Sequence, residues 1–239
     1  MSLFGLIGHP VVHSLSKELF DSRFERKHEY RLVDLESVVD LRERVQRLGL
    51  AGFNVTIPHK VSMMSTVDRL TAEAAEVGAV NCVRVESDGS LTGHNTDAEA
   101  FEWAAYNGSL TTSGRRALIL GTGGGARAVA AALKRMGLEY TMVSRSPDSK
   151  SISYDEAYRM ADTVEIIVNA TPVGMWPEVN ATPWMKPELL TENHRVYDLV
   201  YNPTPTRLMQ EAAEHGALVK DGMAMLRRQA ELSWRFWGI

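Results

Sequence analysis

Cysteine is almost absent from this sequence: Cys82 is the only one, so no disulfide can form within the chain. This excludes a disulfide-based scaffold and is typical of proteins in a reducing compartment. A single cysteine also excludes a zinc site built from several thiolates. His9, His13 and His59 show no metal-ligand spacing, and we therefore expect no bound metal.

Long apolar runs and an excess of positive charge are also missing. No stretch approaches the roughly 20 apolar residues that a membrane-spanning helix needs. The start of the chain lacks the basic and apolar regions of a signal peptide, and Gly8, His9 and Pro10 interrupt it early. The net charge is -4 and no long Lys/Arg run occurs, which argues against nucleic acid and anionic membranes as partners. We expect a cytoplasmic protein that acts on a small molecule.

The residues that are present describe an ordinary globular chain. Its 239 residues are 44% hydrophobic and 23% charged, enough for one large domain or two compact ones. Short β-rich runs alternate with segments of helical period, which predicts α/β architecture with mostly parallel sheets covered on both faces. The predicted strands are Leu3–Gly8, Tyr30–Leu35, Gly52–Thr56, Val80–Val85, Leu91–Asn95, Ala117–Leu120, Tyr140–Ser144, Glu165–Asn169 and Arg195–Leu199, and the first predicted helices cover Ser16–Lys27 and residues 38–48.

Three segments indicate how these elements are organised. Ser87-Asp88-Gly89 predicts the tight turn of an antiparallel hairpin at the edge of the first sheet. A polar stretch, Asn107–Arg116, predicts a domain boundary nearby. The last segment, Met223–Trp237, has helical spacing but no place in a doubly wound nucleotide domain, so we expect it to pack on the first half. Trp234 and Trp237 are predicted to be core or interface aromatics; the alternative is a ligand-binding pair.

A glycine-rich loop follows the strand predicted over Ala117–Leu120. Gly121-Thr122-Gly123-Gly124-Gly125-Ala126 fits the pattern G-x-G-x-x-A and precedes an alanine-rich helix predicted over Ala126–Met136. In dinucleotide-binding folds the first glycine permits the turn, the second lets the backbone approach a pyrophosphate, and the small third residue lets helix pack on strand. The loop predicts a dinucleotide site; the alternative is a tight turn without a ligand.

The end of the next strand discriminates between cofactors. Ser144-Arg145-Ser146 stands where NAD-binding versions usually carry an acidic residue. Arg145 can pair with a 2′-phosphate through two donors, which favours NADP(H). Asp148 comes later and is a weaker candidate for the ribose. The alternative for Arg145 is an ordinary solvated arginine.

Polar residues also follow two strands of the first half. The segment 54–60, Asn-Val-Thr-Ile-Pro-His-Lys, ends a strand in a proline-broken turn, where open α/β sheets present ligand-binding groups. The segment 93–97, Gly-His-Asn-Thr-Asp, ends a hairpin strand before a helix. On residue type alone, Lys60 is a surface lysine and Asp97 is the N-cap of that helix.

Eight segments together resemble the ordered signature blocks of shikimate dehydrogenases, and the resemblance extends from residue 5 to about residue 237. They are His13-Ser14-Leu15-Ser16, Asn54-Val55-Thr56-Ile57-Pro58-His59-Lys60, Gly78-Ala79-Val80-Asn81, Asn95-Thr96-Asp97, the glycine loop, Asn169-Ala170-Thr171-Pro172-Val173-Gly174-Met175, Asp198-Leu199-Val200-Tyr201-Asn202-Pro203 and Gly222-Met223-Ala224-Met225-Leu226-Arg227-Arg228-Gln229. The resemblance implies an α/β substrate domain with a mostly parallel sheet over 1–98 and about 222–239. It also implies a Rossmann-type NADP-binding domain over about 99–221, with a cleft between the two domains.

The resemblance assigns roles to residues wherever the motifs match. Lys60 and Asp97 would form the catalytic pair. Ser14 and Ser16 would bind the substrate carboxylate, and the other substrate residues would be Thr56, Asn81, Asp97, Tyr201 and Gln229. The cofactor would be bound by Gly121, Gly123, Gly124, Gly125, Ala126, Ser144, Arg145, Thr171 and Gly222.

The activity implied by the resemblance is the reversible NADPH-dependent reduction of 3-dehydroshikimate to shikimate, in aromatic amino acid biosynthesis. The Lys60 ammonium fits the donor of a proton to the ketone oxygen as charge develops there, and Asp97 would orient it; the sequence leaves open which of the two carries the proton in the transition state. Two alternatives stay open: an NAD-using quinate/shikimate dehydrogenase, and a catalytically silent sensor that binds the same ligands. We expect a monomer or a homodimer.

Some positions depart from the family pattern. They are Lys17, Phe20 and Asp21 after the first serine block, Cys82 in place of a usual threonine, and Ser149 with Lys150 where a second basic residue is common. The last of these predicts a weaker grip on a 2′-phosphate. After the changed serine block, Ser16 has the alternative role of N-cap for a helix over Lys17–Arg26.

Overall fold

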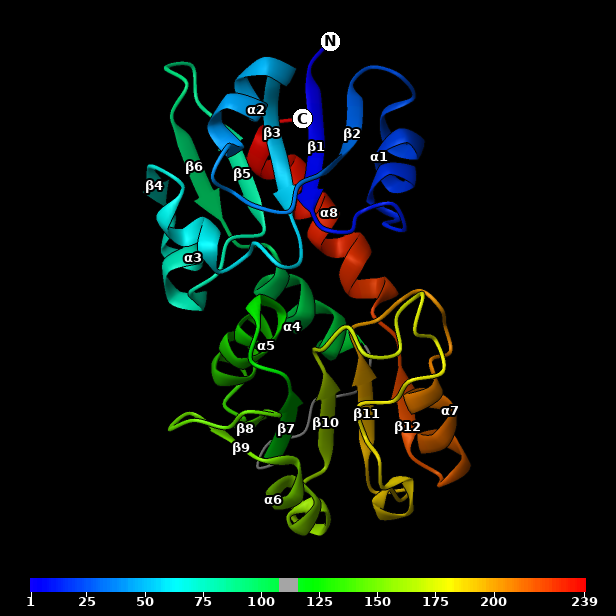
Figure 1. The fold of residues 1–239 in the computed structure, drawn as a ribbon. Coiled ribbons are helices and arrows are strands. Elements are labelled where there is room, and N and C mark those ends of the chain that lie inside the picture. Colours follow the sequence, from blue (N-terminus) through cyan, green and yellow to red (C-terminus); the bar gives the residue numbers. More distant parts are fainter. Residues whose placement is uncertain (108–115) are drawn as a thin grey trace. The chain divides into compact units, whose positions relative to one another are not determined.

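Figure 1 shows the fold of the chain in a computed structural model that describes residues 1–107 and 116–239. The chain divides into two compact units. Unit 1 comprises Met1–Asp97 and Arg227–Ile239, and unit 2 comprises Ala98–Leu226. Most of the polar stretch 107–116, near which we expected a domain boundary, lies outside the described residues.

Unit 1 is built on a six-stranded sheet with the strand order β2-β1-β3-β5-β6-β4. β1 pairs in parallel with β2 and β3, whereas β5 runs antiparallel to both β3 and β6. The strands are β1 Leu3–Gly8, β2 Glu29–Asp34, β3 Leu50–Val55, β4 Arg69–Leu70, β5 Cys82–Val85 and β6 Leu91–His94. The helices between them are α1 Ser16–Phe24, α2 Leu41–Leu48, the short 3-10 helix η1 Ser62–Ser65 and α3 Ala72–Val77.

The predicted hairpin of β5 and β6 is confirmed, but its expected place at the edge of the sheet is wrong. β4 pairs with β6 on its outer side and forms the edge instead. β4 contains only Arg69 and Leu70, both exposed, so no alternation of apolar and polar residues could reveal it in the sequence.

Both faces of this sheet are buried, because successive side chains of a strand point to opposite sides. Phe4 and Leu6 of β1 belong to a cluster that includes Phe20 of α1. Ile7 of β1 belongs to a second cluster on the other face, with Leu41 of α2. Helices therefore cover the sheet on both sides, as the sequence predicted.

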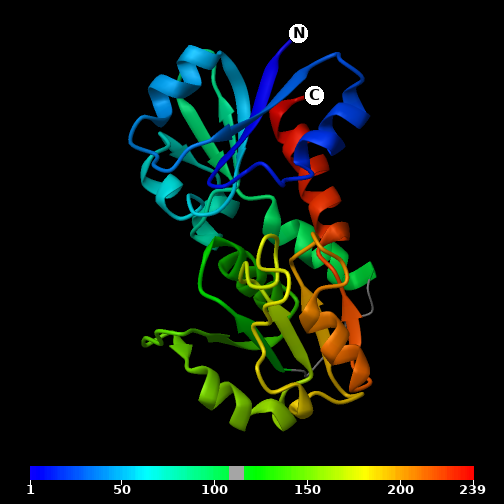
Figure 2. The ribbon, with the colours of Figure 1, turned by 45° about the vertical axis from the view of Figure 1, so that its right-hand side comes forward.

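The last helix, α8 Met223–Trp237, begins in unit 2 and ends in unit 1, where it packs beside α1 (Figure 2). Trp237 stacks on Phe4 with ring centroids 4.7 Å apart, and its Nε1 donates to Val83 O at 2.9 Å. Gly52 of β3 makes room for this indole, because a Cβ there would lie 2.6 Å from Trp237 Nε1. The predicted core position of Trp237 is therefore confirmed.

Unit 2 contains a second six-stranded sheet with the order β12-β11-β10-β7-β8-β9, in which every pairing is parallel. The strands are β7 Arg116–Leu120, β8 Glu139–Val143, β9 Ser151–Ile152, β10 Ile166–Asn169, β11 Arg195–Asp198 and β12 Leu218–Lys220. The helices are α4 Asp97–Asn107, which starts at the boundary of the units, α5 Gly124–Arg135, α6 Tyr154–Arg159 and α7 Arg207–Glu214, with the 3-10 helices η2 Ala161–Thr163 and η3 Pro187–Leu189.

The strand order of unit 2 reverses next to β7, which is the point where doubly wound sheets bind ligands at the carboxyl ends of their strands. Both units are thus α/β, as predicted.

Two short strands, β9 and β12, and the helix α7 were not predicted. No helix of the described residues is long and apolar enough to cross a membrane.

Candidate active site

Polar residues of unit 1 meet at one end of the strands of its sheet. Because β3 and β6 both run antiparallel to β5, their carboxyl ends lie at the edge where β5 starts. Lys60 follows β3, Asp97 follows β6, and Asn81 precedes β5. The topology therefore brings these three residues together, although 37 positions separate Lys60 from Asp97.

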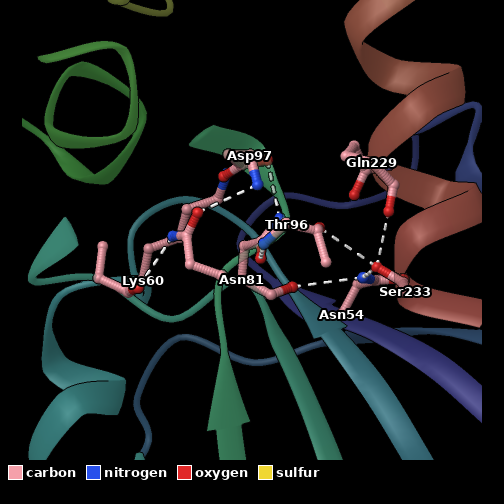
Figure 3. Close-up of polar contacts among 9 residues, drawn as sticks. Asn54, Lys60, Asn81, Thr96, Asp97, Gln229 and Ser233 are labelled. Carbon is pink, nitrogen blue, oxygen red and sulfur yellow. Dashed lines mark hydrogen bonds and ion pairs between the residues drawn. The ribbon is translucent and has the colours of Figure 1, made fainter. Parts of the chain in front are cut away.

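Lys60 and Asp97 form an ion pair (Figure 3). Lys60 Nζ donates to Asp97 Oδ2 at 2.7 Å, and the two side chains are 19% and 5% exposed. Water screens such a pair less than it screens ions on the surface. The ammonium has three N–H donors and this bond uses one of them, so Lys60 can bond to Asp97 and to a ligand oxygen at the same time.

Asn81 holds the second oxygen of the Asp97 carboxylate. Asn81 Nδ2 donates to Asp97 Oδ1 at 2.7 Å and to Thr96 Oγ1 at 2.9 Å, and Asn81 Oδ1 accepts from Thr96 N at 2.7 Å. Both carboxylate oxygens thus bond to side chains, and α4 begins at Asp97 itself. The reading of Asp97 as the N-cap is therefore wrong.

Ser14 and Ser16 follow β1 and leave the sheet at the same edge, since β1 is parallel to β3. Ser14 Oγ donates to Ser16 Oγ at 3.1 Å, and Ser16 N donates to Ser14 Oγ at 3.3 Å. α1 begins at Ser16, and the N-cap position is Leu15, which makes no side-chain cap. The alternative role of Ser16 as the N-cap is therefore wrong.

The residues that depart from the family pattern after Ser16 have roles within α1. Phe20 is fully buried in the core of unit 1. Lys17 and Asp21 form an ion pair of 2.7 Å on the outer face of the helix, with side chains 43% and 49% exposed. These three residues thus have structural roles within α1.

The other predicted substrate residues lie on three different segments. Thr56 follows β3, is half-buried and donates its N–H to Ile7 O at 2.9 Å. Gln229, on α8, is 9% exposed and lies on the face of that helix turned toward Thr96 (Figure 3). Tyr201 is half-buried on the loop after β11, in unit 2.

Asn54, Tyr30 and Ser233 form a buried polar group that was not predicted from the sequence. Tyr30 OH donates to Asn54 Oδ1 at 2.9 Å, and Asn54 Nδ2 donates to Ser233 Oγ at 2.8 Å. The signal for it was an asparagine inside the apolar strand Leu50–Val55, because a polar group buried in a sheet needs a partner.

Cys82 begins β5 next to Asn81 and is completely buried. Burial raises the pKa of its thiol to about 12, so the side chain stays neutral at physiological pH. A neutral buried thiol is a poor nucleophile. Cys82 therefore belongs to the core in the place of the threonine usual in the family.

The glycine loop of unit 2 fits a pyrophosphate. Gly121 has a φ of +109°, which an L side chain rarely adopts, and a Cβ there would lie 3.0 Å from Thr171 Cγ2. A Cβ at Gly123 would meet nothing within 4 Å, so the backbone on this side is open to a ligand. α5 begins at Gly124, two residues before the predicted start, and its first N–H groups have no partners within the helix. Such a helix end attracts phosphate.

The loop after β8 presents Arg145 to solvent. Ser144 Oγ donates to Ser146 O and accepts from Ser146 N, both at 3.1 Å, which closes a tight turn around Arg145. Asp148 Oδ1 accepts from Ser151 Oγ at 2.7 Å and from Lys150 N at 3.0 Å. The Asp148 carboxylate is thus used within the loop, which supports its reading as a weak candidate for ribose.

Thr171 and Gly222 border the carboxyl ends of β10 and β11. Thr171 N and Oγ1 donate to Asn169 Oδ1 at 3.0 and 2.7 Å. Gly222 N donates to Val200 O at 3.3 Å, and a Cβ at Gly222 would overlap the carbonyl of Leu199. Only glycine therefore fits at position 222.

Asp198 is a buried carboxyl that joins these segments. Its Oδ1 accepts from Asn169 Nδ2 at 2.8 Å and from Val200 N at 3.0 Å, and its Oδ2 accepts from Thr206 Oγ1 at 2.7 Å. Burial raises the pKa of Asp198, and the three hydrogen bonds lower it; burial has the larger effect, and the resulting pKa is about 6. A raised pKa means that the folded protein holds this proton more tightly than the unfolded chain. The stability that the group contributes is therefore full below about pH 4 and is lost as the pH rises through about 6.

Comparisons with known proteins agree with the fold of both units. A family model described as the shikimate dehydrogenase substrate binding domain matches residues 6–83. A shikimate dehydrogenase (NADP(+)) from Caldanaerobacter subterraneus subsp. tengcongensis is 35% identical over 98% of this chain and 91% of its own length. The structure of shikimate dehydrogenase 1 from Peptoclostridium difficile matches with a TM-score of 0.92 at 32% identity, over 100% of this chain and 92% of that one. Shikimate 5-dehydrogenase from Thermus thermophilus, solved in complex with NADP(H) and shikimate, matches with a TM-score of 0.85 at 33% identity, over 100% of this chain and 94% of that one.

Proposed function

The chain belongs to the shikimate dehydrogenase family, and we propose on that basis that it catalyses the reversible NADPH-dependent reduction of 3-dehydroshikimate to shikimate. The observation that carries this proposal is the partly buried ion pair of Lys60 and Asp97, 2.7 Å long, where β3 and β6 of unit 1 end. An inactive ligand-binding relative would not need a proton donor that is held in one position. The pair therefore favours an enzyme over a catalytically silent sensor.

Lys60 supplies the proton in this proposal. Bound NADPH supplies the hydride for reduction of the ring ketone. As negative charge grows on the ketone oxygen, the Lys60 ammonium donates a proton to it, and in the reverse direction the same nitrogen takes the proton back. Asp97 keeps the ammonium in place through Oδ2 and accepts from a substrate hydroxyl.

The remaining polar residues of unit 1 bind the substrate. Ser14 and Ser16 offer hydroxyl groups to its carboxylate, and the N-terminal end of α1, at Ser16, favours negative charge. Thr56 and Gln229 bind ring hydroxyls, and Asn81 acts chiefly by holding the Asp97 carboxylate. We assign Tyr201, on unit 2, to the substrate as well. Unit 1 is thus the substrate-binding domain.

Unit 2 is the NADP-binding domain. The turn at Gly121 and the start of α5 at Gly124 fit the pyrophosphate, because the backbone there is open and its N–H groups point out of the helix end. Ser144 and Arg145 bind the 2′-phosphate, and Arg145 is exposed on a turn whose own carboxylate, Asp148, is already hydrogen-bonded. We assign Thr171 and the backbone of Gly222 to the nicotinamide end.

The proposal also covers the location and the oligomeric state of the protein. We propose that the protein works in the cytoplasm, as a monomer or a homodimer; its single cysteine is buried and fits a reducing compartment.

The test of the proposed function is a comparison of four assays. Purified protein receives shikimate or quinate, each with NADP+ or NAD+, and the absorbance of the reduced nicotinamide is followed. We expect the highest kcat/KM with shikimate and NADP+. A preference for NAD+ with quinate would support the alternative enzyme. Binding of shikimate and NADP+ without turnover would support the sensor.

A further inference from the structure

The hydroxyl groups of Thr96 and Ser233 lie in the interior of unit 1, near the Lys60–Asp97 pair (Figure 3). Thr96 is 1% exposed and Ser233 is 0% exposed. Their oxygens are 3.4 Å apart, although 137 positions separate the residues in the sequence. Neither residue is among the substrate or cofactor residues proposed above, so their buried hydroxyls need a separate explanation.

The direction of each hydrogen bond can be assigned, because a hydroxyl has one hydrogen and two lone pairs. Ser233 Oγ donates to Gln229 O at 2.9 Å and accepts from Asn54 Nδ2 at 2.8 Å. Its hydrogen is therefore used, and in the contact between the two hydroxyls Thr96 must be the donor. Thr96 Oγ1 in turn accepts from Asn81 Nδ2 at 2.9 Å.

These bonds form a continuous chain from the last helix to the catalytic carboxylate. The chain starts at Gln229 O and passes through Ser233 and Thr96 to Asn81, whose Nδ2 also donates to Asp97 Oδ1 at 2.7 Å. A buried network with its donors satisfied stiffens the groups that it joins. Here the joined groups are the backbone of Gln229, a proposed substrate residue, and the carboxylate that holds Lys60.

We propose that Thr96 and Ser233 are positioning residues of the active site, whose hydroxyls together fix Asp97 relative to Gln229. This inference rests on the proposed function. Loss of the Ser233 hydroxyl leaves the Thr96 hydroxyl without its acceptor, and loss of the Thr96 hydroxyl takes one of the two acceptors from Asn81 Nδ2. Packing alone does not explain a serine at 233, because alanine is a better helix former and leaves only a small gap. Substrate turnover is expected to suffer, and cofactor binding is not, since the proposed cofactor residues belong to unit 2.

The test uses variants of the full chain that separate the hydroxyl from the shape of the side chain. Thr96→Val removes the hydroxyl and keeps the volume, whereas Thr96→Ser keeps the hydroxyl. Ser233→Ala removes the second hydroxyl. Ser22→Ala is its matched control, because Ser22 Oγ also donates to the carbonyl four residues earlier, Glu18 O, at 2.7 Å, but on the exposed side of α1.

For each variant, and for the double variant Thr96→Val with Ser233→Ala, we would measure kcat/KM for shikimate at saturating NADP+, KM for NADP+ and Tm. Thr96→Val and Ser233→Ala should each lower kcat/KM for shikimate about tenfold, with KM for NADP+ changed by less than about twofold, because each loses a buried hydrogen bond on the substrate side only. Thr96→Ser and Ser22→Ala should behave like wild type. The double variant should lose less than the product of the two single losses, since both single variants remove the same bond.

The outcomes separate this inference from the proposed function. A wild-type protein that does not oxidise shikimate would refute the function, and the positioning role with it. An active wild type whose Thr96→Val and Ser233→Ala variants lower Tm but keep kcat/KM would show that the hydroxyls serve stability alone. Single losses that multiply in the double variant would show that the two hydroxyls act independently, which would overturn the connected chain.

Discussion

Replacement of Lys60 by alanine is the perturbation that separates proton transfer from substrate binding most clearly. The variant loses the ammonium that bonds to Asp97, while Asn81 continues to hold the other oxygen of that carboxylate. Proton transfer by a positioned group is worth about 10²–10⁴ in rate, so kcat for shikimate oxidation should fall by about that factor. KM for shikimate should change little, because the serine segment and Gln229 remain in place.

The same substitution also affects stability, and the two effects must be measured separately. The Asp97 side chain is 5% exposed, and it loses its charged partner. Breaking a buried pair costs up to about 3–5 kcal/mol, and water that enters through the exposed fifth of the Lys60 site lowers this value. Lys60→Met, which keeps the apolar stem, should lose as much kcat as Lys60→Ala while it retains more of the packing.

The assay follows NADPH formation from shikimate at a temperature well below the Tm of every variant. Lys17→Ala is the control, because Lys17 also forms an ion pair of 2.7 Å with an aspartate, but its side chain is 43% exposed. This control should keep wild-type kcat and KM. A Lys60→Ala variant with normal kcat and a strongly raised KM would refute the acid role and leave Lys60 as an anchor for the substrate.

Three further substitutions test other parts of the account. Arg145→Ala should raise KM for NADP+ about tenfold to a hundredfold and leave KM for NAD+ unchanged, since it removes one charged hydrogen bond to the 2′-phosphate; an unchanged cofactor preference would remove Arg145 from the site. Wild-type protein should lose at most about 3 kcal/mol of its free energy of unfolding as Asp198 ionises between about pH 4 and 7, and Asp198→Asn should not show this loss. The variant should therefore be most stable relative to wild type above the raised pKa of about 6. Denaturant unfolding at several pH values checks this, and an identical pH profile in variant and wild type would contradict the raised pKa. Gly52→Ala should lower the free energy of unfolding by about 1–3 kcal/mol, because its Cβ would press on the indole of Trp237; a thermal melt with unchanged Tm would show that α8 can shift at no cost.

The parts of the fold that the sequence predicted are those with a long periodic signal or a motif. β1 was predicted with its observed bounds, Leu3–Gly8, and α8 with its observed bounds, Met223–Trp237. The strands that were missed are short: β4 and β9 have two residues each and β12 has three. Runs of that length contain no period, and the neighbouring strand fixes their place in the sheet. The same limit explains why the predicted edge hairpin is not at the edge.

The residues of the candidate site could be predicted in part, but their contacts could not. Lys60 and Asp97 were found only through the resemblance of their motifs, since each residue alone has an ordinary structural explanation. Their ion pair depends on strand order, because β5 lies between the two strands that carry them. The roles of Thr96 and Ser233 could not be predicted, because their contact spans 137 positions and involves residue types that are common on surfaces.

In the proposed mechanism, the Lys60 ammonium and the Asp97 carboxylate act on the oxygen that gains or loses the proton. A crystal structure of the protein with shikimate and NADP+ measures this directly. We expect Lys60 Nζ to lie within hydrogen-bond distance, about 2.6–3.2 Å, of the hydroxyl on the carbon that faces the nicotinamide. Shikimate bound with its carboxylate at Lys60, and with that hydroxyl on other residues, would contradict the claim.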